Sequence, residues 1–577
     1  SGYLPRAGRW GTGKGMSTSS NGVSRVAAPA DRPWLSHYPK GVSWDIPTDS
    51  YRNALEMLEE TFQKFAAAPA QENLGHVMYY REVEQQSREL ATFFQSKGLK
   101  PGDTLAIQLP NVLQYLVTLF AGIRAGLRVV NINPLYTPAE MKGPLRDSGA
   151  KAIVILANFA DKLEKVLPET ELQLMVVTQI ADSLPLLKSC LVNFIVKRVK
   201  KMVPAYHLPQ AISWRSALST GRAGRYQRPE VPSDQTLFLQ YTGGTTGVPK
   251  AADLTHANIV ANVLQCKASF YMLEPGKEVL IAALPFYHIF GLTVNSLLLT
   301  HLGARLILVT NPRDIPAFIK VLQDSRYTMF TGLNTLFNAL MNNPDFTKID
   351  FSASKIVVAG GMALQQAVGE RWLKLTGKPI LEGYGLSETS PVLCCNTLSQ
   401  NVPGTIGQPF PKTEIAILDT EGKRVPLGER GEICARGPQV MRGYYKKPEE
   451  TAQVMTADGY FRTGDAGTMD ERGYVRIVDR IKDMILVSGF NVYPNEVEEV
   501  LMTLPGVKEA AAIGVPDAQA TERVKACVVR SRDTLTEEEV IEHCRKSLAA
   551  YKVPKVVQFY PELPKTNVGK ILRRELR

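Results

Sequence analysis

Short runs rich in β-branched residues alternate with segments of helical length from about residue 75 to about residue 480. The runs include 104–109 (TLAIQL), 151–156 (KAIVIL) and 305–309 (RLILV), and the segments of helical length include 112–125 and 315–324. Strands separated by helices usually pair in parallel, with helices on both faces of the sheet. The alternation therefore predicts an α/β fold with largely parallel sheets.

The pattern changes near residue 480 to a compact α+β arrangement. In this part, Thr536 and Glu539 form a capping box at the start of a predicted helix. We expect a large N-terminal domain over 31–480, with mixed, largely parallel sheets flanked by helices. We expect a small C-terminal domain over 481–577, a length that can fold on its own.

Residues 1–30 are interpreted as a disordered leader or tail outside the fold, because Met16 and the Ser-Thr-Ser-Ser after it resemble a natural start. A mitochondrial transit peptide is the alternative, since Arg6, Arg9 and Lys14 occur without an acidic residue. The segment lacks the amphipathic stripe that a transit peptide needs. No apolar run reaches 18 residues, so we expect no membrane-spanning helix.

The net charge limits the classes of binding partner, and the cysteine content limits the kinds of site and the compartment. The 577 residues carry 67 Lys and Arg against 56 Asp and Glu, a formal charge of +11 that favours anionic partners. No run interleaves basic with aromatic residues, so we expect no nucleic-acid binding. Seven cysteines without a C-x-x-C argue against a disulfide framework and a clustered zinc site, and they favour a reducing cytoplasm.

The most informative segment is 241–250 (YTGGTTGVPK), which follows the strand-like run 237–240. Glycines let the backbone turn tightly and direct amide groups inward, which creates a nest for anionic oxygens. It is not a Walker A loop, because Pro249 precedes the lysine and Ala251 follows it. A plain turn is the alternative. The predicted phosphate-binding residues are Thr242, Gly243, Gly244, Thr245, Thr246, Gly247 and Lys250.

This loop resembles the phosphate loop of the adenylate-forming (AMP-binding) superfamily, and the chain from about Trp34 onward is similar to the bacterial long-chain fatty acid–CoA ligases of that superfamily. The resemblance rests on an ordered set of motifs: 133–138 (NPLYTP), 311–316 (NPRDIP), 334–338 (NTLFN), 382–388 (EGYGLSE), 463–465 (TGD), 479–480 (DR), 485–494 (ILVSGFNVYP) and 564–570 (PKTNVGK). It implies the adenylate-forming fold, with a mobile C-terminal domain. It also implies that ATP, a long-chain fatty acid and coenzyme A give acyl-CoA, AMP and diphosphate through an acyl adenylate, feeding fatty acid degradation with Mg²⁺ as cofactor.

Glu388 lies in an otherwise uncharged loop, so its carboxylate is a natural oxygen ligand for Mg²⁺; a helix-capping role is the alternative. The resemblance implies that Glu388 binds magnesium with Thr242, and that Asp465 and Arg480 bind the ribose. Asp465 in an ordinary turn is the alternative. The remaining nucleotide-binding residues implied by the resemblance are Gly360, Gly361, Glu382, Gly383, Tyr384, Gly385 and Ser387, where Ser387 replaces the usual threonine.

Lys570, considered alone, belongs to a solvated basic tail. The resemblance implies that it contacts the substrate carboxylate and the α-phosphate, where a cation offsets charge as two anions approach each other. The resemblance implies that Lys482 lies at the hinge between the large and the small domain. Rotation of the small domain is expected to withdraw Lys570 and bring Gly489 to the coenzyme A channel.

The run 284–299 contains no charged residue, which favours an acid with an apolar tail over an amino acid. Within it, Phe286 and His288 are predicted to bind the acid, although a core histidine is equally compatible with the sequence. The segment 194–203 mixes apolar residues with Lys and Arg and could lie on an anionic membrane; an ordinary surface helix is the alternative. We expect a cytoplasmic protein, either free or peripheral on the inner membrane.

Some features depart from the family or leave alternatives open. Asp253, one turn after the phosphate loop, could weaken ATP binding or face solvent, and Ala251 and Ile481 also replace usual residues. The alternatives in function are a ligase that loads a carrier protein, a medium-chain acyl-CoA ligase and a non-catalytic fatty acid-binding protein. A homodimer is one oligomeric state that the sequence leaves open.

Overall fold

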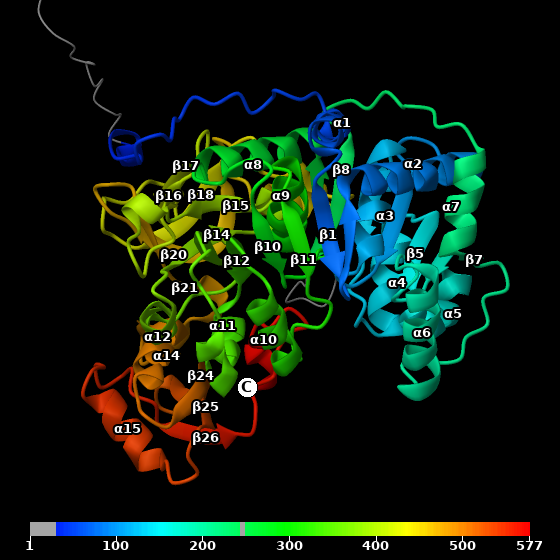
Figure 1. Ribbon diagram of the computed structural model, residues 1–577. Helices are drawn as coiled ribbons and strands as arrows, with labels where there is room; N and C mark the ends of the chain where they lie inside the picture. The colour runs from blue at the N-terminus through cyan, green and yellow to red at the C-terminus, as the bar shows by residue number, and fades with distance from the viewer. Residues whose placement is uncertain (1–30, 243–248) are drawn as a thin grey trace, which may run out of the picture.

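The computed structural model describes residues 31–242 and 249–577 (Figure 1). Its first large sheet runs in the order β19-β9-β8-β4-β3-β5-β6-β7, with parallel pairing from β8 to β7 and antiparallel pairing at β8–β9 and β9–β19. Its strands are β3 (Thr104–Gln108), β4 (Arg128–Asn131), β5 (Ala152–Leu156), β6 (Leu174–Thr178), β7 (Ile212–Ser213), β8 (Thr236–Thr242), β9 (Lys250–Thr255) and β19 (Gly443–Tyr444).

The second large sheet runs in the order β16-β15-β14-β13-β12-β10-β11-β1-β2. Pairing is parallel from β14 to β1, and antiparallel strands close both ends. The strands are β1 (Pro69–Asn73), β2 (His76–Tyr79), β10 (Val279–Ala282), β11 (Arg305–Leu308), β12 (Met329–Gly332), β13 (Ile356–Ala359), β14 (Ile380–Gly385), β15 (Val392–Cys395) and β16 (Gln408–Pro409). The predicted α/β architecture is confirmed.

Helices cover these sheets and separate them. All residues of α3 (Leu113–Arg124) are buried, and α3 contacts β3, β4 and β1, so it packs between the two sheets. The predicted helix over 315–324 is α10 (Ile315–Asp324). The other helices of this part are α1 (Ala54–Phe65), α2 (Tyr80–Ser96), α4 (Pro138–Asp147), α5 (Ala160–Val166), α6 (Leu186–Phe194), α7 (Trp214–Ala223), α8 (His256–Ser269), α9 (Leu299–His301), α11 (Asn334–Met341), α12 (Gln366–Thr376) and α13 (Pro448–Gln453).

A four-stranded antiparallel sheet follows, in the order β17-β18-β20-β21. Its strands are β17 (Glu414–Leu418), β18 (Gly431–Arg436), β20 (Phe461–Met469) and β21 (Val475–Arg480). The register of β20 and β21 places Asp465 opposite Arg480. Two residues 15 positions apart in sequence therefore become neighbours, since the hairpin folds back on itself.

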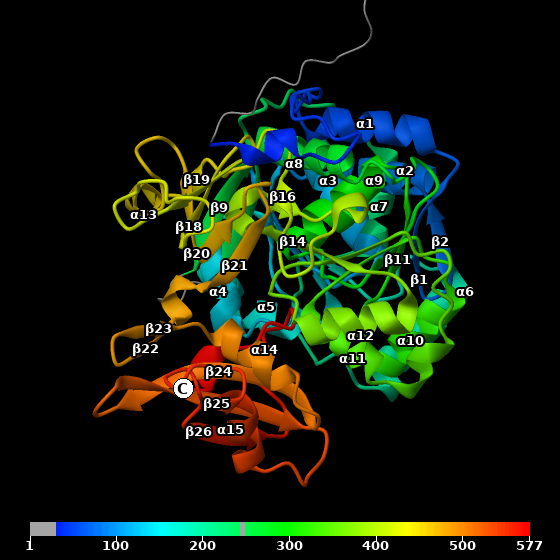
Figure 2. The ribbon, with the colours of Figure 1, turned by 90° about the vertical axis from the view of Figure 1, so that its left-hand side faces the viewer.

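The last part of the chain forms a five-stranded sheet with two helices on it (Figure 2). Val497 and Leu501 of α14 and Val540 and Cys544 of α15 are buried in its core. The Thr536 and Glu539 capping box is confirmed at the start of α15. The elements are β22 (Ile485–Val487), β23 (Phe490–Val492), α14 (Pro494–Met502), β24 (Val507–Asp517), β25 (Thr521–Arg530), α15 (Glu537–Arg545) and β26 (Val556–Tyr560).

This C-terminal part packs against helices α11 and α12, which belong to the part of the chain that contains the two large sheets (Figure 2). The hydroxyl of Thr335 donates to the carbonyl of Gly569 at 3.0 Å, and the amide of Asn338 donates to the carbonyl of Lys508 at 2.9 Å. Among the described residues, no helix is long and apolar enough to cross a membrane.

Candidate active site

The two ends of the predicted phosphate loop lie side by side. β8 ends at Thr242 and β9 begins at Lys250, and these two residues are partners in the antiparallel register. The Thr242 hydroxyl donates to the Lys250 carbonyl at 3.3 Å. The predicted residues Gly243, Gly244, Thr245, Thr246 and Gly247 lie outside the described residues. The hairpin thus presents a hydroxyl and an ammonium group at the same edge.

Glu388 lies beside this edge, because the short helix Ser387–Thr389 contacts both β8 and β9. Its side chain is buried, and its Oε1 accepts a hydrogen bond from the Tyr444 hydroxyl at 2.8 Å. Its carbonyl accepts from the amide of Met441 at 2.7 Å. The carboxylate is therefore held by a neighbouring strand.

Asp465 is the centre of a second cluster. Its Oδ1 lies 2.9 Å from Arg480 Nε, and the hydroxyl of Tyr384 donates to its Oδ2. Burial raises the pKa of the Asp465 carboxyl, and the charge of Arg480 and the Tyr384 hydrogen bond oppose that rise. Tyr384 follows Gly383 at the end of β14. The residue predicted for the adenine thus contacts the residue predicted for the ribose.

The glycines predicted for the nucleotide pocket permit close packing. A Cβ at Gly360 would lie 2.6 Å from the Phe290 ring, and one at Gly385 would lie 1.9 Å from a backbone carbonyl oxygen. Gly383 is less crowded, with the nearest atom at 3.3 Å. Glu382 accepts from a backbone amide at 2.8 Å, and burial raises its pKa to about 7.

Lys570 reaches this cluster from the last part of the chain. Its Cε lies 3.7 Å from the position of a Cβ at Gly361, beyond the end of β13. Burial, followed by the charge of Arg480, lowers the pKa of Lys570 to about 8, although the carboxylates of Asp465 and Glu388 oppose the shift. The side chain is partly buried among charged residues, unlike a lysine in a solvated tail.

Of the two residues predicted to bind the acid, His288 lies near Lys570 and Phe286 lies in the hydrophobic core. Burial lowers the pKa of His288 to about 3, and the Lys570 charge acts in the same direction, so the imidazole is neutral beside the ammonium group. Phe286 is fully buried, and its ring centroid lies 5.2 Å from that of Tyr115. Of the two, His288 is the one near the charged cluster.

One predicted residue, Gly489, is not brought to this cluster. It is exposed at the turn between β22 and β23, where an added Cβ would meet no described atom within 4 Å. Lys482, in the short helix Ile481–Asp483, lies close enough to the cluster for its charge to lower the pKa of Asp465 and of Lys570. The arrangement therefore unites Lys570 with the nucleotide residues and leaves Gly489 outside.

Sequence reasoning missed Tyr444, and of the two alternatives for Asp253 the structure contradicts the exposed one. The ring face of Tyr444 lies 5.4 Å from Lys250 Nζ, and its hydroxyl contacts Glu388. Asp253 is 7% exposed and binds Arg442 at 2.7 Å, so it does not face solvent. The only signal in the sequence was an aromatic pair flanked by basic residues, which is common on surfaces.

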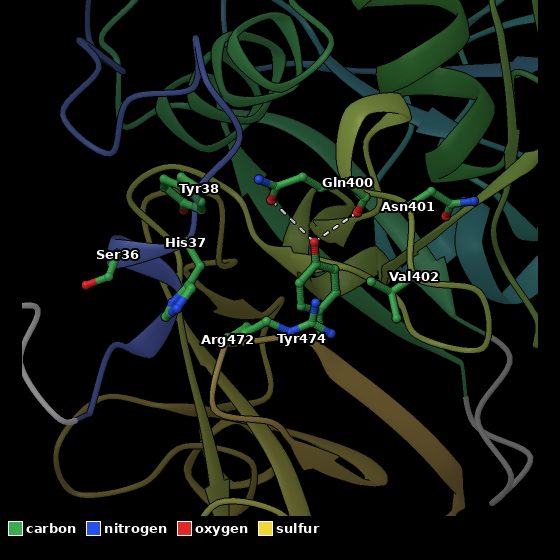
Figure 3. A pocket seen from close by; sticks show the side chains of 8 residues that line it. All are labelled: Ser36, His37, Tyr38, Gln400, Asn401, Val402, Arg472 and Tyr474. Atoms are coloured by element: carbon green, nitrogen blue, oxygen red, sulfur yellow. Dashed lines mark hydrogen bonds between the residues drawn. The ribbon is translucent and has the colours of Figure 1, made fainter.

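A separate pocket of about 420 Å³ lies between the N-terminal segment and the β21 hairpin (Figure 3). Tyr474 donates to the carbonyl of Gln400 at 2.9 Å within it, and His37 and Arg472 also line it. None of its lining residues belongs to the predicted site.

Comparison with known proteins identifies the family. A model described as AMP-binding enzyme matches residues 58–445, and one described as AMP-binding enzyme C-terminal domain matches residues 496–570. The long-chain-fatty-acid–CoA ligases of Escherichia coli and Yersinia pestis are each 51% identical, over 94% and 95% of this chain and 97% and 98% of theirs. The ligase of the same name in Bacillus subtilis is 37% identical, over 95% of this chain and 98% of its own.

Solved structures agree with this assignment. The anthranilate CoA ligase AuaEII in complex with anthranoyl-AMP has a TM-score of 0.81 at 25% identity, covering 92% of this chain and 97% of its own. ATP-bound MatB from Rhodopseudomonas palustris has a TM-score of 0.77 at 29% identity, covering 91% and 98%. The chain belongs to the AMP-binding enzyme family.

Proposed function

We propose that this protein is an ATP-dependent long-chain fatty acid–CoA ligase. It converts ATP, a fatty acid and coenzyme A into acyl-CoA, AMP and diphosphate through an acyl adenylate, and its product enters fatty acid degradation. The proposal rests above all on Lys570, which lies among Asp465, Glu388 and Gly361. The identity to ligases of this activity over nearly the whole chain supports it.

The nucleotide is held by residues from three sheets. Asp465 accepts hydrogen bonds from the ribose hydroxyls while Arg480 keeps its carboxylate charged, since a cation at 2.9 Å favours that form. Tyr384 flanks the adenine. The triphosphate lies along the hairpin, where Lys250 supplies charge and the loop 243–247 supplies amide donors. The rest of the pocket consists of Gly360, Gly361, Glu382, Gly383, Gly385 and Ser387.

Glu388 and Thr242 fit a magnesium ion, because a carboxylate and a hydroxyl next to phosphate oxygens are the ligands that Mg²⁺ prefers. Tyr444 occupies one side of Oε1 only, and a carboxylate has further lone pairs for a metal. The ion would neutralise charge on the triphosphate oxygens.

In the first half-reaction, a carboxylate oxygen of the acid attacks the α-phosphorus, a P–O bond forms, and diphosphate leaves with the electron pair of the broken bond. Lys570 contacts both anions and lowers their repulsion as they approach. The acid lies along the apolar run that contains Phe286, with its carboxylate near the neutral His288. The protein supplies no nucleophile.

The second half-reaction needs a different arrangement. We propose that 31–480 is the AMP-binding domain and that 481–577 is a mobile domain, which rotates about Lys482. The two separate family matches, 58–445 and 496–570, support this division. Rotation removes Lys570 and brings Gly489 to the channel, where the thiolate of coenzyme A attacks the acyl carbonyl and AMP leaves.

We also propose peripheral association with an anionic membrane, through α6 and the π-helix Ile195–Val199 that follows it. The exposed fraction of Leu187 is 87%, and Leu191, Phe194 and Val199 are each at least 59% exposed. Lys and Arg residues lie next to them in 197–201, which suits a surface of anionic headgroups.

ATP-dependent release of diphosphate on addition of oleate tests the main proposal. Release without oleate, or none with it, would refute it. Equal thioester yield with a holo-carrier protein and with coenzyme A would favour the carrier-loading alternative, and a screen of C8 to C18 acids separates the long-chain from the medium-chain activity.

A further inference from the structure

Tyr444 contacts two groups that the proposed mechanism uses to hold the triphosphate, Glu388 and Lys250. Its hydroxyl donates to Glu388 Oε1 at 2.8 Å. The face of the same ring lies 5.4 Å from the ammonium group of Lys250, within the range of a cation–π interaction. A single side chain therefore touches the predicted metal ligand and the lysine at the end of the phosphate loop.

The backbone fixes this ring. β19 pairs with β9 so that Tyr444 faces Ala252 and Gly443 faces Asp253. Arg442 Nη2 lies 2.7 Å from Asp253 Oδ2, and the amide of Tyr445 donates to the carbonyl of Ala251 at 2.9 Å. The Tyr444 ring thus has little freedom to move away from the loop.

The phenol contacts a single oxygen of the carboxylate. The Tyr444 hydroxyl donates a hydrogen bond to Glu388 Oε1, and this bond uses one of the several lone pairs of the carboxylate. The remaining lone pairs of Glu388 are left for another partner.

We propose that Tyr444 is a positioning residue that sets the orientation of the Glu388 carboxylate for the metal–nucleotide complex. The inference rests on the proposed function, because it needs Glu388 as a magnesium ligand. Hydrogen-bond partners of metal-ligating side chains fix their orientation, and their loss typically lowers metal affinity about 10- to 100-fold. The phenol of Tyr444 is placed to do this for Glu388.

The test is Tyr444→Phe, which removes the hydroxyl and keeps the ring over Lys250. ATP binding is measured by calorimetry without fatty acid or coenzyme A, first in EDTA and then over a range of Mg²⁺ concentrations. We expect binding in EDTA to be unchanged, and the Mg²⁺ concentration for half-maximal enhancement to rise about 10-fold or more. An unchanged Mg²⁺ dependence overturns the inference.

Tyr445→Phe is the matched control. This residue directly follows β19, and its hydroxyl accepts a hydrogen bond from Arg128 Nη1 at 3.3 Å instead, so loss of that hydroxyl should leave the Mg²⁺ dependence unaltered. In a Glu388→Gln background, Tyr444→Phe should add no further shift, since the two residues act through one contact. If Tyr444→Phe raises the half-maximal Mg²⁺ concentration as much in the Glu388→Gln background as in the wild type, the inference is overturned.

Both variants are compared with the wild type in thermal melting, so that a general loss of stability is separated from a change in metal response. The two proposals fail differently. A wild-type protein that releases no diphosphate with ATP, Mg²⁺ and oleate refutes the proposed function. An active wild type whose Mg²⁺ response survives Tyr444→Phe refutes only the role of Tyr444.

Discussion

The pKa of Lys570 makes a quantitative prediction for the pH dependence of adenylation. Its value of about 8, against 10.5 for an ordinary lysine, is due first to burial and then to the charge of Arg480. A shift of one pKa unit corresponds to about 1.4 kcal/mol, so holding the protonated Lys570 in the closed site costs about 3 kcal/mol before a nucleotide binds.

The direction of the pH dependence follows from the fact that burial disfavours the protonated form of Lys570. Between pH 8 and 10.5 the closed site binds fewer protons than a state with Lys570 in water, so closure becomes easier as pH rises. Catalysis needs the ammonium form, however, and that form is lost above pH 8. We expect kcat/KM for ATP to fall about tenfold per pH unit above that point.

The assay is diphosphate release from ATP and oleate without coenzyme A, so that no thiol titrates in the same range. Because a bound nucleotide is an anion, the corresponding decline in kcat should lie at higher pH than that in kcat/KM. Lys570→Arg should be slower and should lose the decline, since a guanidinium stays protonated. A decline at the same pH in Lys570→Arg would assign it to another group and refute the reasoning.

The other predictions concern separate parts of the site. Lys570→Ala should lower diphosphate release about 100-fold or more while sparing thioester formation from supplied acyl adenylate, and equal loss of both would contradict its role. Asp465→Ala should raise KM for ATP with little effect on KM for oleate, measured by steady-state kinetics, because its proposed ligand is the ribose of ATP and not the acid. Neutralising the basic residues after α6 should reduce flotation with anionic vesicles and leave activity on dissolved acid unchanged, and undiminished flotation would remove the membrane proposal; these residues are Lys197, Arg198, Lys200 and Lys201.

Patterns within one element were readable from the sequence. The β-branched runs correspond to β3, β5 and β11. β3 and β5 are buried on both faces, and such a strand needs apolar residues throughout. The helix α10 begins and ends where predicted, since Asp314 caps its first turn.

Contacts between distant residues were not readable. Asp253 and Arg442 are 189 positions apart, and Tyr444 lies 56 positions from Glu388. Only the folding of β19 onto β9 brings these pairs together. Asp253 therefore looked like an acid near the phosphate loop, whereas its charge is compensated by Arg442. Placing Lys570 required the position of one domain on the other, which local patterns do not contain.

The contacts between the C-terminal part of the chain and the large sheets suit the proposed rotation. The Glu499 carboxylate accepts from the first amide of α12 at 3.0 Å, and the bonds from Thr335 and Asn338 are also single polar contacts. Each contributes about 1 kcal/mol net, because water can replace its partner. Together these three bonds are comparable to the cost of burying the Lys570 charge, and the anionic charge of ATP beside Lys570 would offset that cost. Because departure of diphosphate removes much of that charge, the proposed mechanism predicts that the first half-reaction weakens the closed arrangement that the second must leave.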